Sequence, residues 1–187
     1  MLEAIQLSKS FDGKSVLANF SARLEKGRKY CLMGVSGSGK TTLINLFLGL
    51  MKPDSGTIRR APDLKMSAVF QEDRLLEQMT AAANIALVSK AANSEIEKLL
   101  TQLGISAESL PQPVSTYSGG MKRRVALARA LLAEYDVLFL DEPYKGLDEA
   151  TRSQVMQIVD RYTKGKTVLL ITHDKEETEG YTPLVLK

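Results

Sequence analysis

The residues best suited to chemistry begin with a loop rich in glycine and serine. Its sequence, GVSGSGKT, has the spacing GxxxxGK[ST] and lies between the apolar segment KYCLM and the helical pattern TTLINLFLGL. Glycines in such a loop let successive backbone N–H groups converge on phosphate oxygens. The Lys40 ammonium then reaches the terminal phosphates, and the Thr41 hydroxyl ligates a magnesium ion. We therefore predict a phosphate-binding loop formed by Gly34, Val35, Ser36, Gly37, Ser38, Gly39, Lys40, Thr41 and Thr42.

Two adjacent acids follow a second apolar segment. VLFL, residues 137–140, leads directly to Asp141 and Glu142. Open parallel sheets bind their ligands at the carboxyl ends of the strands. We expect Asp141 to help hold the magnesium ion and Glu142 to orient or deprotonate the water that attacks the terminal phosphate. The alternative is an ordinary pair of acids at a helix start, with Pro143 in the first turn.

Three residues far apart in the sequence are candidates for the same site. His173 follows the apolar segment TVLLIT and is expected at the same sheet edge, bonded to the terminal phosphate or to Glu142. Gln71 ends the short apolar segment SAVFQ and is a candidate ligand of the metal or of the attacking water. Phe11 either stacks on adenine or packs on the core as an aromatic residue of an edge strand.

A second helix start also has the chemistry of an anion site. The segment YSGGMKRRVALARALL begins a basic, amphipathic helix with Ser118, Gly119 and Gly120. The first backbone N–H groups of a helix have no partner within the helix and lie at its positive end. One small chain therefore carries two helix starts suited to binding an anion.

The elements that must position these residues are typical of an α/β protein. Residues 1–33 alternate apolar and polar positions around a turn at Asp12-Gly13, which predicts an N-terminal antiparallel β-subdomain. Helical periodicity covers residues 72–104, and the rest of the chain alternates helix and buried strand. We predict a mostly parallel sheet covered by helices. The expected organisation is a single domain of residues 1–187, with a short helical subdomain inserted at approximately 72–124.

The composition fits a globular protein without a strong charge preference. The chain has 187 residues, 44% of them hydrophobic, and 25 Lys and Arg against 22 Asp and Glu. A net charge of +3 does not indicate a nucleic-acid partner. The single cysteine, Cys31, is interpreted as a buried, inert thiol in a reducing cytosol. The apolar stretches are too short to span a bilayer, so other subunits must supply any membrane span.

Taken in order, these motifs resemble the ATP-binding cassette (ABC) family over nearly the whole chain. The features that carry the resemblance are Phe11, GVSGSGKT, Gln71, YSGGM, VLFLDEP, KGLDEAT and His173. The resemblance implies a P-loop NTPase core and an ATPase that uses ATP and Mg²⁺. It also implies that Ser118, Gly119 and Gly120 contact the terminal phosphate of the ATP held by a second copy. Asp148 would then lie in the loop that crosses the dimer interface.

The family resemblance also implies partners and a location. We expect a homodimer that is docked on integral membrane permease subunits at the cytoplasmic face, and that energises solute transport. A solute-binding protein is an open further partner. Met121, followed by basic residues and VALARAL, is similar to the nitrate, sulfonate and taurine importer branch, as is VFQEDRLL. Tyr117 stands where leucine is commoner, and Lys145-Gly146 stands where small residues are usual.

Two other functions stay open at this point. One is a soluble cassette protein that acts on nucleic acid or ribosomes, although such relatives usually carry two cassettes or long insertions, and no nucleic acid is expected here. The other is a small-molecule kinase that uses the same phosphate loop, which leaves YSGGM and His173 unexplained.

Overall fold

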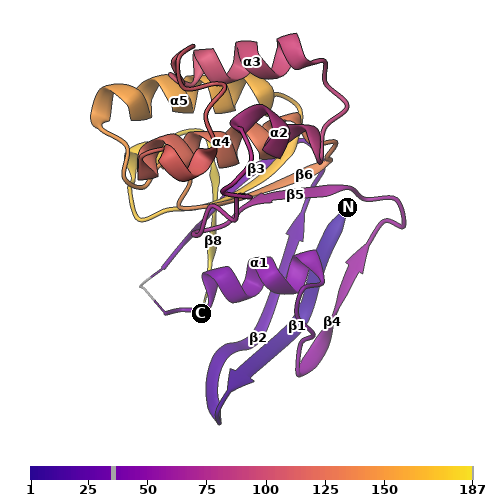
Figure 1. Cartoon of the computed structure of the whole chain (residues 1–187). Helices are drawn as coiled ribbons and strands as arrows, with labels where there is room; N and C mark the ends of the chain where they lie inside the picture. Colours follow the sequence, from indigo (N-terminus) through magenta and orange to yellow (C-terminus); the bar gives the residue numbers. More distant parts are fainter. Residues whose placement is uncertain (35–36, 187) are drawn as a thin grey trace. The chain divides into compact units, whose positions relative to one another are not determined.

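The computed structural model describes residues 1–34 and 37–186, and the chain divides into two compact units. The first unit contains residues 1–66, 135–141 and the chain from Gly165 onward, and the second contains residues 67–134 and 142–164. Figure 1 gives the order of the elements along the chain. Val35 and Ser36 of the predicted phosphate loop lie outside the described residues. Across the described ranges, no helix is long and apolar enough to cross a bilayer.

The first unit contains the predicted antiparallel sheet. Its strands are β1 (Leu2–Phe11), β2 (Lys14–Leu24) and β4 (Ser55–Arg60), in the order β2-β1-β4. Asp12 and Gly13 join β1 to β2 with φ angles of 48° and 75°, which suit a tight hairpin turn between two twisted strands. The sequence did not reveal β4, because SGTIRR has one apolar residue and therefore no alternating pattern.

A parallel sheet forms the rest of the first unit. The strands β3 (Lys29–Met33), β6 (Val137–Asp141), β7 (Thr167–Ile171) and β8 (Thr182–Val185) follow the order β6-β7-β3-β8, and each pairing is parallel. All residues of β6 and β7 are buried, which explains their continuous apolar sequences. Helix α1 (Lys40–Leu48) belongs to the same unit and packs on this sheet through Phe47, whose ring stacks on that of Phe139 at 5.9 Å between centroids. The prediction of a mostly parallel sheet is thus confirmed.

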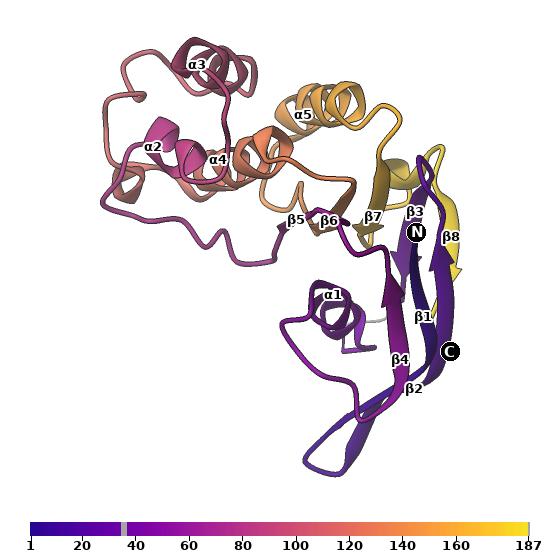
Figure 2. The same ribbon diagram turned by 90° about the vertical axis from the view of Figure 1, so that its right-hand side faces the viewer.

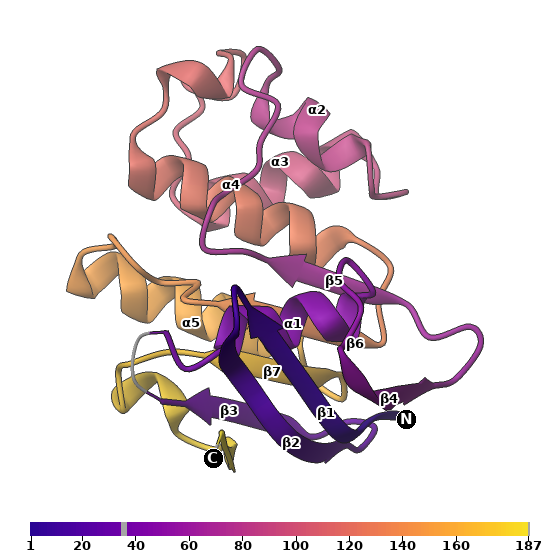
Figure 3. The ribbon, with the colours of Figure 1, turned by 90° about the horizontal axis from the view of Figure 1, so that it is seen from below.

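The second unit begins with the end of β5 (Met66–Val69) and is otherwise helical. It contains α2 (Ala81–Ala86), α3 (Asn93–Gln102), α4 (Gly119–Leu132) and α5 (Glu149–Tyr162), together with a short 3₁₀ turn at Val114–Thr116. Helices α2, α3 and α4 contact one another, and α5 contacts α4 (Figure 3).

The helical prediction for residues 72–104 began too early. Residues 72–80 are not helical, and α2 starts only after Thr80, whose Oγ1 accepts a hydrogen bond from the backbone N–H of Ala83 at 3.2 Å. The buried Asn84 side chain also holds Leu76, with which it exchanges hydrogen bonds to the backbone N–H at 2.8 Å and the carbonyl at 3.1 Å. These side-chain bonds satisfy a loop backbone that helical periodicity cannot reveal.

Candidate functional site

Three parallel strands of the first unit end at the predicted site. In the strand register, Ile171 of β7 lies opposite Asp141 of β6 on one side and opposite Leu32 of β3 on the other. The phosphate loop follows β3 directly, and the exposed His173 comes two residues after β7 ends. Because the carboxyl ends of these strands meet at one edge, the sheet gathers the phosphate loop, Asp141 and the His173 segment.

The start of α1 requires glycine at position 39 for two reasons. Gly39 caps the helix with a φ of 89°, in the left-handed region that other residues enter only with strain. A Cβ atom at this position would also lie 2.8 Å from the carbonyl oxygen of Val16 in β2. Figure 2 shows α1 beside the sheet formed by β1, β2 and β4. Glycine at position 39 therefore allows α1 to begin directly after the loop, so that the positive end of the helix lies next to the loop.

Lys40 and Ser38 present polar atoms within the loop. Lys40 is 7% exposed, and its Nζ donates a hydrogen bond to the Gly34 carbonyl at 2.7 Å. The Ser38 hydroxyl is buried and has no hydrogen-bond partner among the described residues. A buried hydroxyl without a partner is costly, so it points to a ligand that would accept its hydrogen bond. A phosphate oxygen has the right chemistry for both groups.

The side chains of Thr41 and Asp141 are in contact, although the two residues are 100 positions apart in the sequence. The Thr41 hydroxyl donates a hydrogen bond of 2.6 Å to Oδ2 of Asp141, which is 2% exposed. Magnesium is bound in proteins through one or two oxygen ligands, with water and substrate phosphates completing its shell. A hydroxyl and a buried carboxylate in contact beside a phosphate loop fit that requirement.

Glu142 lies directly after the strand end, in a strained backbone conformation. Its φ is 48°, in the left-handed region, which costs a non-glycine residue of order 1–3 kcal/mol. The carboxylate is 20% exposed and lies 4.0 Å from Nζ of Lys145. No helix starts at Pro143, because α5 begins only at Glu149, so the alternative of two acids at a helix start is wrong.

The second helix start lies in the second unit and has the expected form. Ser118 caps α4, and its Oγ accepts a hydrogen bond from the backbone N–H of Met121 at 3.2 Å. A Cβ atom at Gly119 would meet no atom within 4 Å, whereas one at Gly120 would lie 3.4 Å from the Leu147 side chain. The turn that precedes α5 therefore packs beside the first turn of α4.

Asp148 has a structural function within this turn. It caps α5, and its Oδ1 accepts a hydrogen bond from the backbone N–H of Thr151 at 2.9 Å. Hydrogen bonds from Thr151 lower the pKa of Asp148, and the charge of Arg124 adds to the effect. A carboxylate at a helix start is stabilising. The predicted interface function of Asp148 remains a prediction beside this observed one.

Tyr117 faces the interior of the second unit. It is 6% exposed, and its hydroxyl donates a hydrogen bond of 2.8 Å to the Ser109 carbonyl. Burial raises the pKa of the Tyr117 phenol above its usual range. The hydroxyl that distinguishes tyrosine from leucine at this position is therefore used in a hydrogen bond within the second unit.

We expect Tyr117→Phe to lower the free energy of unfolding by about 1 kcal/mol, because it removes one intramolecular hydrogen bond and keeps the ring. The ATP concentration at half-maximal ATPase activity should not change. Urea denaturation and steady-state kinetics measure the two quantities. A raised half-saturation concentration with unchanged stability would show that the Tyr117 hydroxyl contributes to the nucleotide site instead.

Two residues outside the loop have surroundings that the sequence could not reveal. Gln71 is exposed, two residues after β5 ends, and its carbonyl accepts a hydrogen bond from Arg123. Phe11, at the end of β1, is 42% exposed, with Lys9 Nζ 5.5 Å from its ring centroid. The alternative in which Phe11 packs on the core is therefore wrong, and stacking on adenine stays a prediction. Nothing in the sequence distinguishes Arg123 from its basic neighbours Lys122 and Arg124.

The candidate residues are divided between the two units. The phosphate loop, Phe11, Asp141 and His173 belong to the first unit, and Gln71, Glu142, Asp148 and the segment Ser118–Gly120 belong to the second.

Comparisons with known proteins give a consistent result. Residues 17–145 match the sequence model of the family described as ABC transporter. An aliphatic sulfonates import ATP-binding protein of Rhodococcus jostii is 37% identical over 98% of this chain and 70% of its own length. A taurine import ATP-binding protein of Pseudomonas aeruginosa is 36% identical over 94% of this chain and 73% of its own length. This chain spans 51% of a spermidine/putrescine import ATP-binding protein of Fusobacterium nucleatum, to which it is 32% identical.

Solved structures agree with the sequence comparisons. A bacterial ABC transporter cassette solved as a dimer has a TM-score of 0.88 and 25% identity, over 100% of this chain and 94% of its own. The same cassette has also been solved as a dimer in a post-hydrolysis state bound to ADP and Pi, with the same TM-score and coverage.

Proposed function

This chain belongs to the ABC transporter family, and we propose that it is the ATP-hydrolysing subunit of a bacterial importer that works as an ATP-sandwiched dimer. The observation that carries the proposal is the hydrogen bond between Thr41 and Asp141. It joins a phosphate loop to a buried acid at a strand end, which is the arrangement that magnesium-dependent nucleotide hydrolysis requires. The buried Ser38 hydroxyl, which has no hydrogen-bond partner among the described residues, supports a bound phosphate at the same loop.

Within this proposal, each candidate site residue of the first unit has a defined function. The loop residues Gly34 to Thr42 bind the phosphates of ATP, with Lys40 donating to the terminal phosphates, and Phe11 stacks on the adenine. Thr41 and Asp141 hold Mg²⁺, which when bound neutralises charge on the phosphate oxygens. His173 donates a hydrogen bond to the terminal phosphate.

The residues of the second unit complete the reaction. Glu142 orients the attacking water and accepts its proton, and Gln71 contacts the water or the metal. Ser118, Gly119 and Gly120 donate backbone N–H groups to the ATP held by the partner copy, with Asp148 beside them. Two helix starts of opposite copies then lie on either side of one nucleotide. The dimeric state of the similar solved cassette supports this arrangement.

Exposed apolar side chains in the second unit support docking to membrane subunits. Leu76, Leu87 and Val88 are 52%, 60% and 50% exposed. Leu76 belongs to the non-helical segment that follows Gln71, so a partner bound here would contact the segment that carries the metal or water ligand. We propose that permease subunits dock at these side chains on the cytoplasmic side of the membrane. A solute-binding protein would complete the importer.

Mixing two inactive variants tests the sandwich arrangement. We expect Lys40→Met and Gly119→Asp to be inactive alone, the first through its phosphate loop and the second through its α4 start. Mixed in equal amounts, they should recover about a quarter of the wild-type ATPase rate, because half of the dimers are mixed and each has one intact site. Steady-state phosphate release measures the rate.

The structure supplies the control for this experiment. Gly119→Ala should stay active, since its Cβ meets no described atom within 4 Å, and an aspartate there should fold equally well. The aspartate should act by repelling the approaching anion, because its charge lies at the helix start. If the mixture stayed as inactive as its components, the loop and the α4 start would not cooperate between copies.

A further inference from the structure

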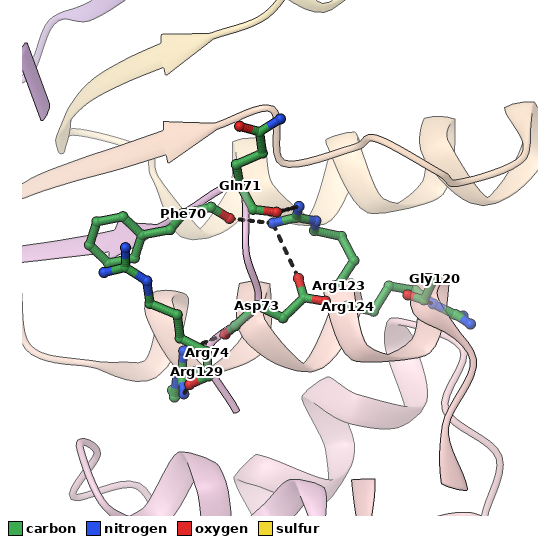
Figure 4. A network of polar contacts seen from close by, with 8 residues as sticks. All are labelled: Phe70, Gln71, Asp73, Arg74, Gly120, Arg123, Arg124 and Arg129. Carbon is green, nitrogen blue, oxygen red and sulfur yellow. Dashed lines mark hydrogen bonds and ion pairs between the residues drawn. The ribbon is translucent and has the colours of Figure 1, made fainter. Parts of the chain in front are cut away.

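Arginine side chains of helix α4 bind the backbone carbonyls of the segment that contains Gln71 (Figure 4). Arg123 donates from Nη1 to the Phe70 carbonyl and from Nη2 to the Gln71 carbonyl, each at 2.5 Å. Arg129, on the same helix, donates from Nη2 to the Asp73 carbonyl at 2.9 Å and from Nη1 to the Arg74 carbonyl at 2.7 Å. Two side chains thus hold four carbonyls within five consecutive residues.

The contacts of Arg123 are partly shielded from water, whereas that of Arg129 with the Arg74 carbonyl is exposed. Arg123 is 5% exposed, and its Nη1 lies 3.2 Å from Oδ1 of Asp73, an ion pair without the geometry of a hydrogen bond. The Arg74 guanidinium covers the Phe70 ring at 3.8 Å from the centroid. Hydrogen bonds from a charged donor are roughly twice as strong as neutral ones, and burial strengthens them further.

The contacts to residue 71 use its backbone and leave its side chain available. Figure 4 shows the Gln71 amide directed away from Arg123, while the Gln71 carbonyl faces the guanidinium. Any residue at position 71 would give the same backbone contact. The contacts therefore fix the backbone position of residue 71 and do not involve the polar atoms of its side chain.

Helix α4 also begins at the second anion site. Ser118 caps the helix, and Arg123 lies within the second turn after it. Arg124 adds a contact to this end, because its Nε donates to the Gly120 carbonyl at 3.2 Å. The side chain that binds the Gln71 carbonyl and the cap of the second anion site therefore lie near the same end of one helix.

We infer that Arg123 and Arg129 are positioning residues for Gln71. This inference rests on the proposed function of Gln71 as a ligand of the metal or the attacking water.

A double-mutant cycle between Arg123→Met and Gln71→Ala tests the inference. Methionine keeps much of the buried stem and removes both hydrogen bonds to the carbonyls. We expect Arg123→Met to lower kcat about tenfold in the wild-type background and less than twofold in the Gln71→Ala background, because the side chain to be positioned is then absent. The loss of thermal stability should be the same in both backgrounds.

A second readout does not depend on activity. Hydrogen exchange of the backbone N–H groups in residues 70–76, measured without nucleotide, should accelerate at least about tenfold in Arg123→Met as the segment opens locally. Arg123→Lys should recover part of the protection, since one ammonium can hold a single carbonyl. Lys122→Ala is the matched control, because Lys122 also lies on α4 but pairs with the exposed Glu77 carboxylate at 2.8 Å.

The outcomes separate this inference from the proposed function. If Arg123→Met lowers kcat by the same factor in both backgrounds, or leaves exchange in residues 70–76 unchanged, the positioning function is refuted. If Gln71→Ala by itself leaves kcat unchanged, the proposed function of Gln71 fails, whatever Arg123 does. An equal effect of Lys122→Ala and Arg123→Met on exchange would also refute the specific positioning.

Discussion

A chain that carries Glu142→Gln should bind ATP with unchanged affinity and hydrolyse it about 10²–10⁴-fold more slowly, the contribution typical of a positioned general base. Glutamine keeps the size and the hydrogen-bonding reach of the side chain, but it does not accept the proton of the attacking water. The carboxylate is 20% exposed, so the substitution creates no buried polar group. Single-turnover hydrolysis and nucleotide titration measure the two quantities separately.

The same variant should accumulate as a dimer when ATP is present. Hydrolysis removes the terminal phosphate that both copies contact, so a chain that binds ATP without cleaving it keeps the two faces together. Size-exclusion chromatography with and without ATP would detect the change. Glu149→Gln is the matched control, because it removes an equal charge at the start of α5 and should hydrolyse ATP normally. If the Glu142→Gln chain stays monomeric with ATP and hydrolyses ATP at the wild-type rate, both the general-base function of Glu142 and the ATP-sandwiched dimer are contradicted.

The second large effect is expected from Lys40→Met, which should weaken ATP binding about 10- to 100-fold, as expected when a charge-assisted hydrogen bond is lost. The Lys40 side chain is buried, and methionine retains most of its apolar stem. The free chain should therefore keep most of its stability. The measurement is the rise in melting temperature caused by saturating ATP, which depends on binding to the folded state alone.

A second lysine of the first unit provides the control for this experiment. Lys166 donates a hydrogen bond of 2.8 Å to the Tyr135 carbonyl, much as Lys40 does to Gly34 at 2.7 Å. Lys166→Met should therefore lower stability by a similar amount and leave the rise in melting temperature with ATP intact. If both variants lost that rise equally, the Lys40 result would reflect damage to the first unit instead of a lost phosphate contact.

The fold was predictable where the chain carries a local periodic signal. The continuous apolar sequences of β6 and β7 and the alternating pattern of β1 and β2 all correspond to observed strands. The pattern failed at β4, which has a single apolar residue, and at residues 72–80, where the Asn84 side chain bonds to the backbone of Leu76 and Thr80 caps the start of α2. Side-chain bonds to the backbone leave no periodic trace, so the first residues of the helical segment were misassigned.

The candidate site shows a similar division. The phosphate loop depends on glycines at fixed spacing between a strand and a helix, so its type could be recognised from consecutive residues. The 2.6 Å contact between Thr41 and Asp141 depends instead on strand order, because β7 lies between β3 and β6 and aligns their carboxyl ends. The inward orientation of Tyr117 likewise follows from the Ser109 carbonyl, which lies in a separate loop.

The sequence by itself determined the family, the phosphate loop, the acidic pair and the second helix start, because each is encoded by residues close together along the chain. Only the tertiary structure decided that Arg123 and Arg129 hold the backbone around Gln71, that Glu142 has a left-handed backbone, and that Asp148 caps α5. The physical reason is that backbone carbonyls occur at every residue. A side chain that binds them can choose any segment the fold places nearby, and the sequence of that segment carries no sign of the choice.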